Sequence, residues 1–173
     1  MGLVHIYCGD GKGKTSAAVG AAIRFAGSGG KVLFSQFMKN GMSSELSVLK
    51  EIPGITVKIP YELRICPFYL EEEEKAEAAK EYPRRFEELI HLANESDYGM
   101  LVMDEIMSCI SCGYIKLESV VEFIKNKPDG LEVIMTGRNP DEALLSCADY
   151  VSEIQKYKHP YDKGVLARKG IEY

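Results

Sequence analysis

The sequence predicts a single α/β domain in which a mostly parallel sheet is covered by helices on both faces. Short apolar runs alternate along the chain with segments of helical periodicity, as in parallel sheets whose strands are buried on both faces. A glycine-rich turn joins the first apolar run to the first helical segment. The 173 residues are enough to bury one core and too few for two, so we expect one domain over residues 1–173.

The glycine-rich turn has the composition of a phosphate-binding loop. Residues 3–7 are predicted to be a strand and residues 16–26 a helix, and C-G-D-G-K-G-K-T lies between them. Glycines let successive main-chain N–H groups point inward, and the helix start adds its positive dipole end, so a polyphosphate is held mainly by main chain. Lys14 is expected to reach the outer phosphates and Thr15 to offer its hydroxyl to Mg²⁺. The predicted binding residues are Gly9, Asp10, Gly11, Lys12, Gly13, Lys14 and Thr15.

The pattern departs from G-x-x-x-x-G-K-[ST] only at Cys8, which replaces the first glycine. A glycine-rich turn before a helix is the alternative interpretation. The strand before the loop and the helix after it favour the fold of the P-loop NTPases, of RecA-like type.

The next elements are expected in regular order. Residues 31–37 are predicted to be a strand, residues 45–51 a short helix and residues 55–59 a strand that alternates apolar and polar side chains. Residues 38–44 form a polar loop at a strand's carboxyl end, where open α/β sheets place ligands. An ordinary connection explains this loop equally well.

The middle of the chain loses its periodicity. Residues 61–69 are aromatic and irregular, which indicates a satellite core or, less favoured, a loop that walls an apolar ligand. A long helix is predicted from the acidic residues 71–74, which complement the helix dipole. Pro83 is expected to kink or restart it.

A second candidate site follows residues 98–103, which are predicted to form an apolar strand that ends in Asp104-Glu105. A strand ending in an acidic pair downstream of a phosphate loop is typical of Walker B, in which the Asp holds Mg²⁺ directly or through water. We therefore expect Thr15, Asp104 and Glu105 to form the metal site.

The last third completes the predicted sheet. A helix around 117–124 precedes a strand at 131–135, which leads to Arg138 at the carboxyl edge. Arg138 is expected to pair with a polyphosphate, or otherwise with an acidic side chain. Asn139-Pro140-Asp141-Glu142 predicts a helix start with Asn139 as N-cap, and residues 151–157 predict a final strand.

For two further candidate sites, a structural role is the favoured interpretation. His159 suits catalysis, but a lone His before a proline is more often structural. Cys109 and Cys112 have zinc-like spacing, yet the other Cys and His residues supply no paired spacing for two more ligands.

Composition excludes several classes of protein. A net charge of -5 argues against a general nucleic-acid binder, and no apolar run approaches the roughly 20 residues that span a bilayer. Five cysteines and no signal peptide make a reducing cytoplasm the expected setting.

Taken together, the motifs resemble the P-loop type of corrinoid adenosyltransferases (ATP:cob(I)alamin adenosyltransferases). The similarity runs in order along nearly the whole chain. It includes C-G-D-G-K-G-K-T at 8–15, S-Q-F-M-K at 35–39, V-M-D-E at 102–105, T-G-R-N-P at 136–140, A-D-Y-V-S-E at 148–153, K-H-P-Y-D-K-G at 158–164 and the ending G-I-E-Y.

The resemblance implies transfer of the 5′-deoxyadenosyl group of ATP to the Co(I) of cob(I)alamin or a related corrinoid, with release of triphosphate. It implies Lys14 and Arg138 as catalytic residues, Mg²⁺ as the metal, a reductase that supplies Co(I), and a homodimer. Phe68 and Tyr69 lie in roughly the region that faces the corrin in this family, where a tryptophan is usual and this chain has none.

Two other functions stay open at this point. A P-loop phosphotransferase or NTPase would use Glu105 on a hydroxyl or water and would form ADP. A non-catalytic, ATP-responsive corrinoid-binding module would bind both ligands without turnover.

Overall fold

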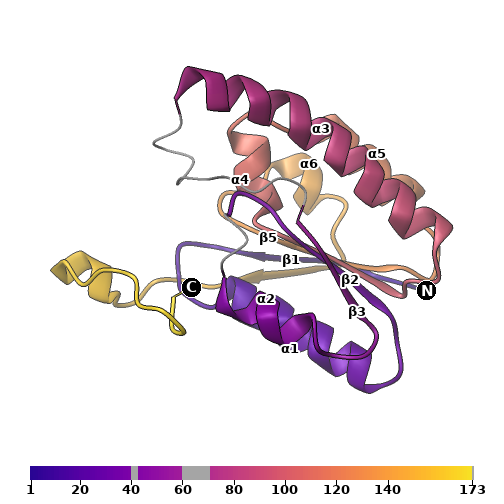
Figure 1. The fold of residues 1–173 in the computed structure, drawn as a ribbon, viewed down its shortest axis with the longest axis horizontal. Coiled ribbons are helices and arrows are strands. Elements are labelled where there is room, and N and C mark those ends of the chain that lie inside the picture. The colour runs from indigo at the N-terminus through magenta and orange to yellow at the C-terminus, as the bar shows by residue number, and fades with distance from the viewer. Residues whose placement is uncertain (40–42, 60–70, 173) are drawn as a thin grey trace.

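The computed structural model describes residues 1–39, 43–59 and 71–172, and within them the strands form one parallel sheet (Figure 1). The order across the sheet is β3-β2-β4-β5-β1-β6. The strands are β1 Val4–Cys8, β2 Val32–Gln36, β3 Ile55–Lys58, β4 Met100–Asp104, β5 Glu132–Thr136 and β6 Tyr150–Glu153.

Helices cover both faces of this sheet, as predicted (Figure 1). Helices α1 (Lys14–Gly27) and α2 (Ser44–Leu49) lie on one face. The opposite face carries α3 Glu72–Glu95, α4 Ile106–Ser111, α5 Leu117–Asn126 and α6 Glu142–Leu145. The predicted α/β fold, a parallel sheet covered by helices on both faces, is therefore confirmed.

The core is divided by the sheet into two apolar clusters. Every residue of β2 and of β4 is buried, which explains their nearly continuous apolar sequences. Ala18 and Ala22 of α1 are fully buried, since small side chains let this helix pack closely against the sheet. The other cluster packs α3, α4, α5 and α6 on the far face.

Strand order determines which loops meet. Because all strands are parallel, the segments after β1, β2, β4 and β5 leave the same edge of the sheet. The register of β2 and β4 places Gln36 opposite Asp104, and β5 lies between β4 and β1. This edge collects the phosphate loop, the acidic pair and Arg138.

The expected restart at Pro83 is wrong, because α3 continues through that residue as one helix. Tyr82 before the proline and Phe86 after it are both buried against the core. Proline has no N–H, so one helical hydrogen bond is missing at this point. The packing of Tyr82 and Phe86 offsets that loss.

The helix after β5 begins later than predicted. Asn139 has a left-handed φ of 49°, and Asp141 is the N-cap, whose carboxylate accepts a hydrogen bond from the Ala143 N–H at 2.9 Å. The predicted final strand is also shorter, since β6 ends at Glu153. Among the described strands it lies at the sheet edge and pairs with β1 alone, so fewer contacts extend it.

The short helix α4 directly after the acidic pair was not predicted. Its apolar residues are too few to show a period. No helix within the described ranges has an apolar stretch suited to crossing a bilayer.

Candidate active site

The phosphate loop is shaped by glycines that contact the segment after β6. Gly9 has a φ of 104° and Gly13 a φ of 125°, a region that other residues rarely adopt. A Cβ at Gly9 or Gly11 would lie 2.5 or 2.6 Å from the Ile154 carbonyl oxygen. The Gly11 N–H donates to that same oxygen at 2.7 Å, so the loop is fastened to the C-terminal part of the chain.

Lys14 lies inside this loop. Its side chain is buried, and Nζ donates to the carbonyl oxygens of Gly9 and Gly11, each at 2.8 Å. Burial lowers the pKa of Lys14, and the charge of Glu105 opposes that shift. The ammonium group is therefore held inside the loop by these two carbonyl oxygens.

Thr15 and Asp104 join the loop to the end of β4. The Thr15 hydroxyl donates to Asp104 Oδ1 at 2.9 Å, and the Thr136 hydroxyl donates to the same oxygen at 2.6 Å. Asp104 is completely buried. Since a hydroxyl has one hydrogen and two lone pairs, Thr15 keeps its lone pairs for a metal ion while it binds Asp104.

Glu105 adopts a left-handed conformation with φ 61°. Its N–H donates to the Thr136 hydroxyl oxygen at 2.9 Å, and its carboxylate accepts from Ser108 Oγ at 2.7 Å. Strained non-glycine residues persist where surrounding contacts hold them, and they concentrate at functional sites. These two bonds direct the Glu105 carboxylate toward the cavity described below.

A second group of side chains surrounds the other oxygen of Asp104. Gln36 Nε2 donates to Asp104 Oδ2 and to Glu45 Oε1, each at 3.0 Å. Lys39 Nζ lies 3.4 Å from Asp104 Oδ2 and 3.7 Å from Glu45 Oε1. Sequence reasoning did not assign roles to Gln36, Glu45 or Thr136. Two adjacent polar residues, Ser35 and Gln36, at the end of an otherwise apolar strand were the available signal.

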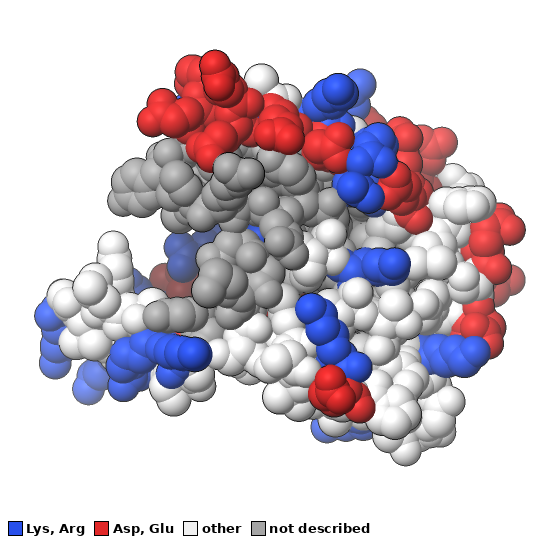
Figure 2. All heavy atoms as spheres, in the orientation of Figure 1, with Lys and Arg blue, Asp and Glu red and all other residues white. Residues whose placement is uncertain are grey.

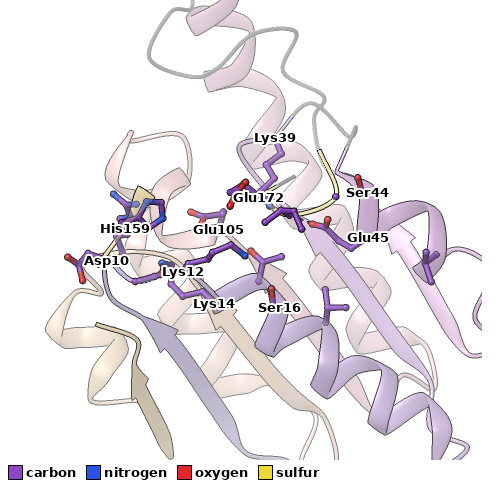
Figure 3. A pocket seen from close by; sticks show the side chains of 18 residues that line it. Asp10, Lys12, Lys14, Ser16, Lys39, Ser44, Glu45, Glu105, His159 and Glu172 are labelled. Carbon is purple, nitrogen blue, oxygen red and sulfur yellow. Dashed lines mark hydrogen bonds and ion pairs between the residues drawn. The ribbon is translucent and has the colours of Figure 1, made fainter. Parts of the chain in front are cut away.

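Lys39, Glu45 and Glu105 border a cavity of about 540 Å³, a size suited to a nucleotide (Figure 3). Its walls come from the phosphate loop, α2, the segments after β2, β4 and β5, and the C-terminal segment. Of the predicted residues, Asp10, Gly11, Lys12, Gly13, Lys14, Thr15, Glu105 and Arg138 line it. Gly9 and Asp104 lie behind the wall, where they contact Lys14 and Thr15.

Charge on the molecular surface is unevenly distributed. Basic side chains gather over the C-terminal segment, and acidic side chains gather at the start of α3 (Figure 2).

Asp10 fastens the C-terminal segment to the loop, because its carboxylate accepts from the Lys156 N–H at 2.9 Å. This bond lowers the pKa of Asp10.

The remaining candidate residues differ in where they lie relative to the cavity. His159 Nδ1 accepts from the Tyr161 N–H at 3.2 Å and caps a 3₁₀ turn, a structural role, while its ring also lines the cavity. Arg138 is exposed at the cavity and forms no ion pair within the described ranges. Phe68 and Tyr69 lie outside the described residues.

Among the described residues, the Cys109–Cys112 pair has no third metal ligand beside it. Cys109 is buried, Cys112 is exposed, and burial raises the pKa of both thiols. Across the parts of the chain that the structure describes, no cluster of three or more His, Cys, Asp or Glu could hold a metal ion. A metal at Thr15 would therefore need phosphate oxygens as further ligands, which is the usual situation of Mg²⁺.

The sequence is similar to corrinoid adenosyltransferases from several organisms. Corrinoid adenosyltransferase of Escherichia coli strain K12 is 31% identical over 172 residues, which cover 99% of this chain and 86% of that protein. The Pseudomonas aeruginosa corrinoid adenosyltransferase is 29% identical over 173 residues, covering 99% and 84%. Corrinoid adenosyltransferase CobA of Salmonella typhimurium is 30% identical over 172 residues, covering 99% and 86%.

A solved structure supports the fold alone. The cytoplasmic domain of EssC superposes with a TM-score of 0.54 at 16% identity, covering 97% of this chain and 35% of that one.

The family model described as "ATP:corrinoid adenosyltransferase BtuR/CobO/CobP" matches residues 1–173. The chain therefore belongs to the BtuR/CobO/CobP family of ATP:corrinoid adenosyltransferases.

Proposed function

We propose that this enzyme transfers the 5′-deoxyadenosyl group of ATP to the Co(I) of cob(I)alamin or a related corrinoid. Cobalt supplies the electron pair of the new Co–C5′ bond, the C5′–O bond breaks, and its electrons leave with triphosphate. The observation that carries this proposal is the nucleotide-sized cavity lined by the phosphate loop and Lys14, in a chain of this family.

Binding of the triphosphate is proposed to replace the contacts of Lys14 within the loop. The ammonium group would exchange the carbonyl oxygens of Gly9 and Gly11 for phosphate oxygens. The N–H groups at the start of α1 would add main-chain donors and the helix dipole. Because the Gly11 N–H is already bonded to Ile154, it is not among those donors.

The donor set fits Mg²⁺ bound together with phosphate. Thr15 would supply a hydroxyl lone pair, Glu105 a carboxylate, and Asp104 would act through Thr15, since four donors already surround its two oxygens. When bound, Mg²⁺ would neutralise charge on the triphosphate. Arg138 would add a cation at the same edge of the cavity.

The reaction needs no protein base. Co(I) is itself a strong nucleophile, so the chain must align C5′ with cobalt and stabilise the leaving group. Phe68 and Tyr69 remain the proposed corrin-side residues. A separate reductase would supply Co(I).

We further propose a homodimer in a reducing cytoplasm. Exposed Tyr150 and Val151 on the edge strand β6 support association, and the free thiols of Cys8 and Cys109 fit a reducing setting.

The test is an anaerobic mixture of the protein, Mg-ATP and chemically reduced cobalamin. We expect ATP-dependent loss of the Co(I) absorption and formation of a light-sensitive alkylcobalamin, both abolished in Lys14→Ala. Unchanged Co(I) in the wild-type protein would refute the proposal.

A further inference from the structure

Gln36 connects two carboxylates that come from distant parts of the chain. Its side chain ends β2 and is completely buried. One nitrogen, Nε2, donates to both Asp104 Oδ2 and Glu45 Oε1 at 3.0 Å. Asp104 is the last residue of β4, and Glu45 lies in the first turn of α2.

The two carboxylates determine which way the amide faces. An amide oxygen cannot donate, so a flipped Gln36 would set three acceptor oxygens against one another. With Nε2 toward the acids, Oε1 is buried and has no hydrogen-bond partner among the residues that the structure describes. A buried amide oxygen without a partner lowers the stability of the fold, so stability does not explain a glutamine at this position. Its contact with the two carboxylates does.

The contact fixes the rotation of the Asp104 carboxylate together with the Thr136 hydroxyl, which donates to Oδ1 at 2.6 Å. Oδ2 is held by Gln36 and Lys39, so Oδ1 is the oxygen that accepts from Thr15. Thr15 then directs its lone pairs away from Asp104 and toward the cavity. Without the amide, Asp104 would lose a fixed donor on one side and could turn away from Thr15.

Lys39 balances only part of the negative charge here. Its ammonium group lies 3.4 Å from Asp104 and 3.7 Å from Glu45, longer than the two contacts of Gln36. The neutral amide therefore makes the shorter contacts that keep Glu45 and Asp104 in place.

We propose that Gln36 is a positioning residue of the Mg²⁺–ATP site, which orients Asp104, and through it Thr15, for the metal and ties α2 to that site. This inference rests on the proposed function, because it requires ATP to bind with Mg²⁺ beside Thr15. Gln36 does not touch the substrate and acts through Asp104.

The test measures ATP binding by calorimetry as a function of Mg²⁺ concentration and also in EDTA. Gln36→Met keeps the length of the side chain and removes the donor. We expect the Mg²⁺ concentration for half-maximal enhancement of ATP binding to rise about tenfold, a typical effect of losing an outer contact at a metal site. ATP affinity in EDTA should change less than about twofold, because the loop and Lys14 are untouched.

Ser35→Ala is the matched control. Ser35 is also buried, its hydroxyl has no partner among the described residues, and strand alternation directs it to the other face of the sheet. It should keep the wild-type Mg²⁺ requirement. Gln36→Asn, which keeps the donor on a shorter side chain, should give an intermediate shift and serves if Gln36→Met unfolds.

The outcomes separate this inference from the proposed function. Wild-type Mg²⁺ dependence in both Gln36 variants, or an equal loss of ATP affinity with and without Mg²⁺, would overturn the positioning role alone. Absence of Mg²⁺-dependent ATP binding in the wild-type protein would overturn the proposed metal site and this inference with it.

Discussion

The Thr15 hydroxyl donates a hydrogen bond of 2.9 Å to Asp104, which lies 89 positions further along the chain. The bond joins the start of α1 to the end of β4. It makes the phosphate loop and the acidic pair one site, and it directs the lone pairs of Thr15 into the cavity.

Thr15→Val should abolish most of the Mg²⁺ enhancement of ATP binding. Valine keeps the shape of threonine but removes the ligand and the donor to Asp104. We expect at least about a tenfold rise in the Mg²⁺ requirement, measured by calorimetry. Thr15→Ser keeps the hydroxyl and should stay near wild type; equal effects of the two variants would contradict the assignment.

Thr136→Val should destabilise the fold and misplace Glu105. It removes the donor to Asp104 Oδ1 and the acceptor of the Glu105 N–H, both at a buried position. We expect a loss of about 1–3 kcal/mol in the free energy of unfolding, measured in urea. Thr136→Ser should recover most of it, and a valine variant as stable as wild type would show that these bonds are dispensable.

Gly11→Ala should weaken the fastening of the phosphate loop to the C-terminal segment. The added Cβ would lie 2.6 Å from the Ile154 carbonyl oxygen, so backbone must shift. We expect a loss of about 1–3 kcal/mol of stability, together with weaker ATP binding.

Gly20→Ala is the control for the loop variant. Gly20 is exposed within α1, and a Cβ there meets nothing within 4 Å. It should stabilise the protein by about 0.5–1 kcal/mol. Similar destabilisation by both substitutions would remove the steric argument for Gly11.

ATP affinity should begin to fall at a lower pH than the ordinary pKa of a lysine side chain would predict. Burial lowers the pKa of Lys14 below its usual 10.5, and the neutral amine no longer attracts phosphate. The effect on folding has the opposite sign: the unfolded chain keeps this proton to higher pH, so the contribution of Lys14 to stability rises with pH between the two pKa values.

Calorimetric ATP titrations across the alkaline range would test this. Lys50→Met, which removes an exposed lysine at the end of α2, should leave the pH profile unchanged. A decline in affinity that begins only above pH 10.5 would contradict a lowered pKa of Lys14.

Local sequence signals predicted the glycine-rich loop, the acidic pair, and the succession of strands and helices along the chain except for α4. Glycines, Lys14 and Thr15 act within one short turn, so their spacing carries the information. Gln36 and Thr136 could not be assigned in this way. Their partners come from the register of neighbouring strands, which depends on contacts across more than 30 residues.

The errors have physical causes of the same kind. Packing of Tyr82 and Phe86 overrides the local effect of Pro83 in α3. Asn139 adopts a left-handed turn, which moves the helix cap to Asp141. Tertiary packing decided the first position, and a single sequence does not display it; at the second, the local Asp141–Ala143 hydrogen bond sets the cap.

Product analysis of one anaerobic turnover with reduced cobalamin tests the central claim most directly. ATP labelled in the adenosine ring should transfer its label to the corrinoid, with one triphosphate released for each Co(I) consumed. Label recovered in ADP, with phosphate as the other product and no label on the corrinoid, would contradict adenosyl transfer and favour phosphoryl transfer instead.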